Sequence, residues 1–241
     1  MLIWNYIDSG PNLGVYNMAV DEELLARAQA GADRPVLRLY AWQPPAVSLG
    51  RFQKSETAVN AEACKRLGFD IVRRITGGRA VLHDRELTYS IIARTDNPLF
   101  PGTVLGTYKV IAAGLLAGLR NLGIPAELVA RGSRHAERVD KNARDAACFS
   151  SPSWYELLVH GRKIVGSAQR RVSGAFLQHG SILMDYDPQL EALVIPGGCA
   201  GDVVTSIKRE LGRDVPLDVV KEAFVQGFRE ALGVEFVNSG S

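Results

Sequence analysis

The sequence predicts an α+β domain built on a mixed β-sheet with flanking helices. Two observations lead to this prediction. Short strand patterns recur along the whole chain with helical patterns between them, and several strand patterns are joined by turns short enough for hairpins. A chain of 241 residues with 46% hydrophobic and 22% charged residues is ordinary for one large globular domain. We therefore expect one domain over residues 1–241.

Long helices are expected where apolar residues recur three and four positions apart. The first has an apolar face that includes Met18, Leu24 and Leu25, and Gly31 marks its end. The last carries Pro216 near its first turn, where the missing N–H costs nothing. The expected helices span residues 13–30, 59–67, 103–122 and 216–232, with a further short helix from residue 188.

Strands are expected where β-branched and aromatic residues cluster between turn residues. His160 and Gly161 separate two such segments and predict a hairpin. Other neighbouring strands are connected through helices, so the sheet should be mixed. The expected strands span residues 2–7, 36–40, 46–49, 70–73, 80–83, 87–93, 154–159, 163–170 and 176–184.

Composition and charge exclude several classes of function. A net charge of +2 gives no basis for nucleic-acid binding. No apolar stretch is long enough to cross a membrane, and residues 1–9 lack the pattern of a signal peptide. Three cysteines cannot all form disulfides, and neither they nor the four histidines have the spacing of a metal site. We expect a cytoplasmic protein with free thiols, no metal and no nucleic-acid or membrane partner.

Basic residues crowd one segment, residues 131–144, where Glu137 and Asp140 are the opposing acids. A solvated loop is the simpler interpretation. The alternative is a docking patch for an acidic protein, which matters only if the substrate arrives on an acidic carrier.

Residues 73–84 form the first segment with functional features. The adjacent glycines Gly77 and Gly78, between two expected strands, allow the backbone to approach a ligand. Arginines on both sides could hold a phosphate or a polarised carbonyl. Composition alone favours a plainer interpretation, a β-turn with solvated arginines. His83 could equally be structural or catalytic.

Three small residues, Gly166, Ser167 and Ala168, lie inside another expected strand. This composition is poor for a strand unless a ligand, a bulge or a neighbouring helix accounts for it. Lys163, three residues earlier, could place its ammonium near a developing negative charge. A lysine in solvent at the end of a hairpin is an equally good interpretation.

Cys148 lies just before a turn and a strand, beside Phe149. A single cysteine is more often an inert small hydrophobe than a nucleophile. Without a nearby positive charge its thiol stays mostly protonated at neutral pH. Cys64 and Cys199 are expected to be inert.

Taken together, these segments resemble the lipoate–protein ligase and octanoyltransferase superfamily. Residues 73–84 read Arg-Arg-x-x-Gly-Gly-x-Ala-Val-x-His-Asp, residues 161–169 read Gly-x-Lys-x-x-Gly-Ser-Ala-Gln, and residues 178–181 read Gln-His-Gly-Ser. Three ordered motifs make the resemblance specific, and it extends over about residues 2–232. It implies the mixed-sheet catalytic domain shared by biotin and lipoate ligases, with a core at about residues 31–233 and no C-terminal accessory domain.

Within the superfamily, the Cys-Phe-x-x-Pro-Ser-x-Tyr-Glu setting of Cys148 is similar to that of the cysteine-dependent octanoyltransferases. This resemblance implies that Cys148 is the catalytic nucleophile and that Lys163 lowers its pKa. It also implies a substrate-binding set, namely Arg74, Thr76, Gly77, Gly78, Arg79, His83, Gly166, Ser167, Ala168, Gln169 and His179.

The implied reaction moves octanoyl from octanoyl-acyl carrier protein to a lysine of a lipoyl-carrier protein through a cysteine thioester, in lipoate biosynthesis. The acceptor would be a lipoyl domain such as glycine cleavage H protein or an E2 subunit, and no cofactor would be needed. One alternative is an ATP-dependent lipoate–protein ligase, which would use ATP and Mg²⁺. The alternative outside enzymes is a non-catalytic binder of acylated carriers.

Overall fold

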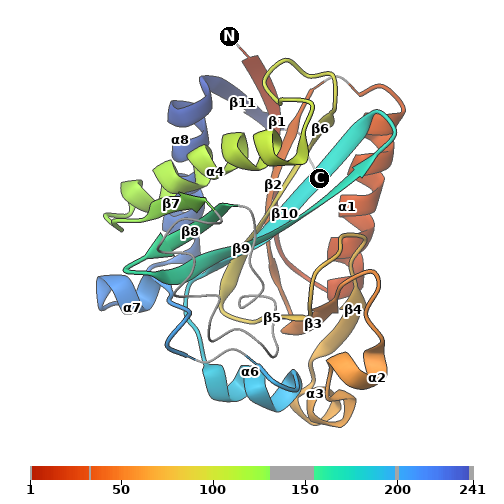
Figure 1. Ribbon diagram of the computed structural model, residues 1–241, viewed down its shortest axis with the longest axis vertical. Coiled ribbons are helices and arrows are strands. Elements are labelled where there is room, and N and C mark those ends of the chain that lie inside the picture. The colour runs from red at the N-terminus through yellow and green to blue at the C-terminus, as the bar shows by residue number, and fades with distance from the viewer. Residues whose placement is uncertain (1, 33, 131–154, 199–200, 239–241) are drawn as a thin grey trace.

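A large mixed sheet with a smaller three-stranded sheet beside it organises the fold (Figure 1). The computed structural model describes residues 2–32, 34–130, 155–198 and 201–238. Within these residues the large sheet has eight strands in the order β11-β1-β2-β6-β10-β9-β8-β7, and the small sheet has the order β4-β3-β5. β1 runs parallel to β2 and β11, whereas the pairs from β2 to β7 are antiparallel. The expected mixed sheet is confirmed.

The strands of the large sheet are β1 (Leu2–Asn12), β2 (Val36–Trp42), β6 (Glu86–Arg94), β7 (Glu127–Ala130), β8 (Tyr155–Val159), β9 (Arg162–Val172), β10 (Ala175–Leu183) and β11 (Val234–Asn238). The strands of the small sheet are β3 (Ala46–Leu49), β4 (Asp70–Arg73) and β5 (Val81–His83). The helices are α1 (Gly14–Gln29), α2 (Ser55–Ala58), α3 (Ala61–Leu67), α4 (Val104–Asn121), α6 (Pro188–Val194), α7 (Ile207–Leu211) and α8 (Leu217–Leu232).

Helix ends follow the expected capping chemistry. The side chain of Thr103 accepts a hydrogen bond from the backbone N–H of Gly106 at the start of α4. Asn60 caps α3 in the same way. Gly68 and Gly233 adopt the left-handed conformation after α3 and α8, which glycine reaches without strain. Every helix and strand expected from the sequence is present in the described residues, with ends shifted by a few positions.

Four short elements, β7, β11, α2 and α7, were not expected from the sequence, and β1 is longer than predicted. β11 pairs in parallel with β1, more than 220 residues earlier in the chain, so no local sequence pattern predicts this strand. β1 continues to Asn12 past an irregularity between Asp8 and Gly10, which interrupts the period of two.

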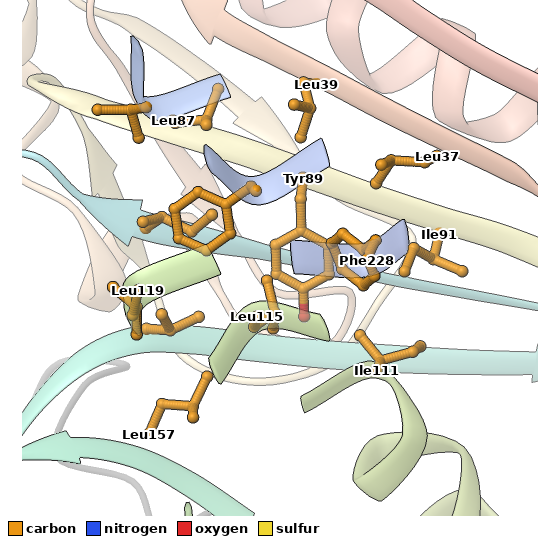
Figure 2. Packing of buried hydrophobic residues seen from close by; sticks show 14 of the residues in the cluster. Leu37, Leu39, Leu87, Tyr89, Ile91, Ile111, Leu115, Leu119, Leu157 and Phe228 are labelled. Atoms are coloured by element: carbon orange, nitrogen blue, oxygen red, sulfur yellow. The ribbon is translucent and has the colours of Figure 1, made fainter. Parts of the chain in front are cut away.

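The main hydrophobic core lies between one face of the large sheet and the helices α4 and α8 (Figure 2). Figure 2 shows Leu37, Leu39 and Tyr89 on the sheet facing Leu115 of α4 and Phe228 of α8. The two helices approach closely because α4 carries glycines where α8 places its phenylalanines. A Cβ at Gly114 would overlap the ring of Phe228, and one at Gly118 would overlap Phe224.

Helix α1 covers the opposite face of the same sheet, where Leu24 and Leu25 pack with Val36 and Leu177. Val36 faces α1 while its neighbour Leu37 faces α4 and α8, because side chains alternate along a strand. Both faces are therefore covered, which explains why all seven residues of β2 are buried. The candidate site lies on the α1 side.

Candidate active site

A row of side chains crosses the large sheet on the α1 face. Tyr40 of β2 lies opposite Thr88 of β6, Thr88 lies opposite Ser181 of β10, and Ser181 lies opposite Gly166 of β9. Residues paired across strands share a face of the sheet. Side-chain size decreases along this row, from a large aromatic residue on β2 to a glycine on β9. The row forms the floor of a pocket.

The pocket contains about 410 Å³ of space, part of it open to solvent. Helix α1, the small sheet and the segment after β4 supply the wall opposite the row. Its lining is Met18, Tyr40, Trp42, Ser48, Arg74, Val81, His83, Thr88, Gly166, Ser167, Ala168, His179, Gly180 and Ser181. Segments from six strands of the large and small sheets and from α1 thus meet at one site.

His83 is held in the wall by hydrogen bonds to both ring nitrogens. Nδ1 lies 2.8 Å from Glu86 Oε1, and Nε2 lies 2.7 Å from Ser48 Oγ. A carboxylate only accepts, so Nδ1 donates to Glu86, and the Ser48 hydroxyl is the partner of Nε2. The ring also stacks on Trp42, with centroids 4.0 Å apart. Glu86 further accepts from Thr88 and Ser181.

A second buried network surrounds Asp21 of α1. Its carboxylate accepts from Arg38 at 2.8 Å, from Ser90 at 2.8 Å and from Tyr40 at 3.1 Å, and it lies 3.1 Å from His179 Nδ1. Burial alone would raise the pKa of Asp21, but the bond from His179 and the charge of Arg38 hold this pKa below its ordinary value. Burial raises the pKa of Tyr40 well above 10, and Asp21 adds to that effect.

His179 links this network to the glycine loop. Its Nε2 lies 2.7 Å from Thr76 Oγ1. Burial lowers the pKa of His179 and outweighs the opposing effect of Asp21, which favours the neutral ring. Because the Nδ1–H of the neutral ring donates to Asp21, Nε2 accepts from the Thr76 hydroxyl. The polar groups of the pocket wall are therefore paired with one another, so the surface that they leave for a ligand is mainly apolar.

Arg74 fixes the loop that contains Gly77 and Gly78. Its guanidinium donates to the carbonyls of Ser48 at 2.8 Å, Gly77 at 3.0 Å and Arg79 at 2.6 Å. The side chain is 4% exposed, so the interpretation of two solvated arginines is wrong for Arg74. Gly77, Gly78 and Arg79 form the braced loop, and among the described residues they do not belong to the lining of the pocket.

Lys163 lies on β9 three residues before Gly166. It is 3% exposed, and its Nζ lies 3.1 Å from Glu156 Oε1, which is also buried. The interpretation of a lysine in solvent at the hairpin end is therefore wrong. The backbone of Lys163 is held on both sides, since its N–H donates to Val203 and its carbonyl accepts from Thr205.

The structure brings part of the predicted substrate-binding set to the pocket. Arg74, His83, Gly166, Ser167, Ala168 and His179 line it, and Thr76 lies directly behind His179. Gln169 is not brought there: its side chain donates to Gln178, which in turn donates to Tyr89. Gln169 follows Ala168 by one position and so points to the opposite face.

Sequence reasoning missed several lining residues, namely Met18, Tyr40, Trp42, Ser48, Val81, Thr88, Gly180 and Ser181. It also missed Asp21, although a signal was present. Asp21 stands three residues after Met18 and four before Leu25, so an acid interrupts the apolar face of a helix. A buried acid on such a face needs partners, and here they are in the site.

Cys148, Cys199 and the basic segment lie outside the described residues, so the site is described without them. Cys64 is buried as a free thiol, and burial raises its pKa. Within the described ranges, no three acidic, histidine or cysteine side chains are grouped so that they could hold a metal ion. In the same ranges, no helix combines the length and apolar character needed to span a membrane.

Comparison with known proteins decides the family. The family model of the lipoyl protein ligase A/B catalytic domain matches residues 14–229. The chain belongs to this family. The octanoyltransferase LipM of Geobacillus kaustophilus is 43% identical over 96% of this chain and 87% of its own length. That of Carboxydothermus hydrogenoformans is 43% identical over 99% and 90%.

Solved structures agree with this membership. A lipoate-protein ligase A crystallised with ATP superposes with a TM-score of 0.81 at 25% identity, covering all of this chain and 90% of its own. The bi-partite lipoate protein ligase from Thermoplasma acidophilum gives 0.76 at 22% identity, covering all of this chain and 88% of its own, which speaks for the fold alone. The expected lipoate-ligase fold is confirmed.

Proposed function

We propose that this protein is an octanoyltransferase of lipoate biosynthesis, which takes octanoyl from octanoyl-acyl carrier protein and attaches it to a lysine of a lipoyl domain through a thioester on Cys148. The acyltransferase class follows from the family and from the activity in the names of its 40–43% identical relatives. The donor, the acceptor and the thioester are the parts that require a test.

The observation that best supports an acyl substrate is the pocket floor from Gly166 to Tyr40. Three inter-strand intervals of about 4.8 Å give a row of about 14 Å. An extended eight-carbon chain measures about 9 Å, from C–C bonds of about 1.5 Å in zigzag. The chain therefore fits across the strands, with its tail toward Tyr40 and Met18. We orient its carbonyl toward β9, because Lys163 lies on that strand.

The proposed chemistry has two steps. Cys148 first gives its proton to solvent. Its thiolate attacks the carbonyl carbon of the donor thioester, the bond to the carrier sulfur breaks, and the carrier leaves as a thiolate that takes a proton back from solvent. The acceptor lysine amine then attacks the enzyme thioester, the C–N bond forms, the Cys148 thiolate leaves and the amine loses its proton. The buried ammonium of Lys163 would favour the thiolate in both steps.

Intact mass spectrometry tests this function. The protein is mixed with octanoyl-acyl carrier protein without nucleotide or Mg²⁺, and we expect the mass to rise by one octanoyl group. Adding an apo lipoyl domain should discharge the adduct and octanoylate the domain. Cys148→Ala should show neither event. Octanoylation of the domain only from free octanoate with ATP and Mg²⁺ would assign the ligase activity instead, and binding without any transfer would assign the non-catalytic alternative.

A further inference from the structure

Phe52 is the most exposed large hydrophobic side chain among the described residues, at 85%. It lies between Arg51 and Lys54, which are also exposed, and the guanidinium of Arg51 lies 5.4 Å from the ring centroid. Single exposed apolar residues are common on protein surfaces. The exposure of Phe52 is notable because the loop that carries it is fixed by hydrogen bonds. Residues 50–54 are called the Phe52 loop below.

The Phe52 loop is held in place by hydrogen bonds rather than left loose. Arg73 of β4 donates to the carbonyls of Gly50 at 2.9 Å and Gln53 at 2.8 Å. The side chain of Gln53 accepts from the N–H of Gly50 at 2.9 Å. A fixed loop thus presents an aromatic ring to solvent. Preorganised aromatic side chains lose little entropy on binding, which is why they often anchor protein interfaces.

The same loop adjoins the candidate active site. The N–H of Arg51 donates to the carbonyl of Thr76 at 2.9 Å. A Cβ at Gly50 would overlap the carbonyl of Gly78, so the Phe52 loop and the glycine loop are in direct contact. Ser48, two residues before the loop, and Arg74, next to Arg73, both line the pocket. A protein seated on Phe52 would therefore lie beside the pocket.

The charge of this surface decides between the two proteins that the proposed reaction needs. Arg51, Lys54 and Arg73 are exposed cations, and Glu56 is the one acid in residues 50–57. A cationic rim repels the ammonium of an acceptor lysine. It attracts a donor that has acidic residues and an arm attached through a phosphodiester. We propose that the Phe52 loop docks the acidic carrier protein that delivers the acyl thioester. This inference rests on the proposed function.

The experiment compares two donors of the same acyl group. Acyl-enzyme formation is measured by mass for octanoyl-acyl carrier protein and for octanoyl-pantetheine, which has the thioester without the protein. Phe52→Ala and Arg51→Glu should each lower kcat/KM for the protein donor about tenfold or more, and the change should appear in KM. A tenfold loss is typical when an anchor residue of a protein interface is truncated. The small donor should react as with wild type. Discharge of a preformed octanoyl-enzyme to the lipoyl domain should also be unchanged.

The matched control is Arg34→Glu, since Arg34 is another exposed arginine and lies before β2. The seven residues of β2 span about 20 Å, and Arg34 lies beyond the end of the strand that is opposite Trp42. Equal losses for both donors would overturn the proposal, because the loop would then support the pocket. A loss confined to discharge would also overturn it, since the loop would dock the acceptor. If Arg34→Glu lowered kcat/KM for the protein donor as much as Arg51→Glu does, the effect would come from net charge alone. That result would also overturn the proposal.

Binding separates this proposal from the proposed function. Titration of octanoyl-acyl carrier protein into Cys148→Ala protein measures docking without chemistry. The added Phe52→Ala change should raise Kd about tenfold, and an unchanged Kd would overturn the docking proposal. Failure of wild-type protein to form an acyl-enzyme with either donor would instead overturn the octanoyltransferase function, whatever the titration shows.

Discussion

Lys163 Nζ lies 3.1 Å from Glu156 Oε1, and both side chains are buried. A buried ammonium beside a carboxylate has part of its field cancelled, so Glu156 should control how strongly Lys163 acts on other groups. The proposed mechanism makes Lys163 act on the Cys148 thiol, so the two residues should affect the reactivity of that thiol in opposite directions.

The first prediction uses that opposition. Lys163→Gln should move the alkaline midpoint of Cys148 alkylation upward by about one pH unit or more, the usual effect of losing a nearby opposite charge. Glu156→Gln should move the midpoint downward, because the charge of Glu156 no longer offsets part of the ammonium's field. Iodoacetamide alkylation against pH, with Cys64 and Cys199 replaced by alanine, measures both. Midpoints that move in the same direction, or stay fixed, would remove the electrostatic role of Lys163.

Cys148 and Cys64 should differ completely in function. Cys148→Ala should abolish both the octanoyl adduct and transfer to the lipoyl domain. Cys64→Ala should retain most activity, because Cys64 is fully buried, its pKa is raised by burial, and it packs in a hydrophobic cluster. Its cost should be confined to stability, on the order of 1 kcal/mol. Transfer by Cys148→Ala at a wild-type rate would end the covalent mechanism.

Met18 should limit the length of the acyl chain. It lies with Tyr40 and Trp42 at the β2 end of the pocket floor, so Met18→Ala should lengthen the pocket there. We expect the ratio of decanoyl to octanoyl transfer to rise about tenfold, the scale for a methylene or two in an apolar pocket. Competition between the two acyl-carrier donors, read by mass, gives the ratio. Val15→Ala on the exposed side of the same helix is the control and should leave the ratio unchanged.

Gly180 and Gly77 should respond differently to the same added methyl group. A Cβ at Gly180 would overlap the carbonyl of Gly166 and lie 2.7 Å from Tyr89 Cε1, so Gly180→Ala must displace backbone. A loss of about 1–3 kcal/mol is expected. A Cβ at Gly77 meets nothing within 4 Å, so Gly77→Ala should unfold like wild type. Denaturant unfolding compares the two variants. Equal unfolding midpoints for Gly180→Ala and Gly77→Ala would contradict the packing of β10 on β9.

Stability should depend on pH through His179. Its pKa is lowered in the folded protein, whereas a histidine in the unfolded chain titrates near 6.5. Between these values the unfolded state binds more protons, so stability rises with pH. Above about pH 6.5 both states are deprotonated and the contribution is constant. Denaturant unfolding from pH 7.5 to 5 should therefore show falling stability, with a weaker slope in His179→Gln.

The control for that slope is His160→Asn, because the side chain of His160 is mostly exposed. Its replacement should preserve the wild-type slope. A His179→Gln protein with the same slope as wild type would show that another group sets the pH dependence.

The sequence by itself determined the long helices, most strands and the mixed sheet, because these follow from local periodicity and from capping residues such as Gly68 and Gly233. The three ordered motifs also led to the family, to Lys163 and to part of the pocket lining. These features can be predicted from the sequence because they depend on residues that are close together in the chain. β11 escaped for the same reason, since its partner β1 lies at the other end of the chain.

Only the tertiary structure decided which residues share the site. Met18, Tyr40 and Ser181 are far apart in the sequence. Strand register places Tyr40 and Ser181 on the α1 face, and the packing of α1 on that face adds Met18 to the same pocket. Register also places the side chain of Gln169 on the face of the sheet opposite the pocket, since neighbouring residues of a strand face opposite sides. The burial of Lys163 against Glu156 was equally hidden, because a lysine at a hairpin end becomes buried only when other segments pack over it.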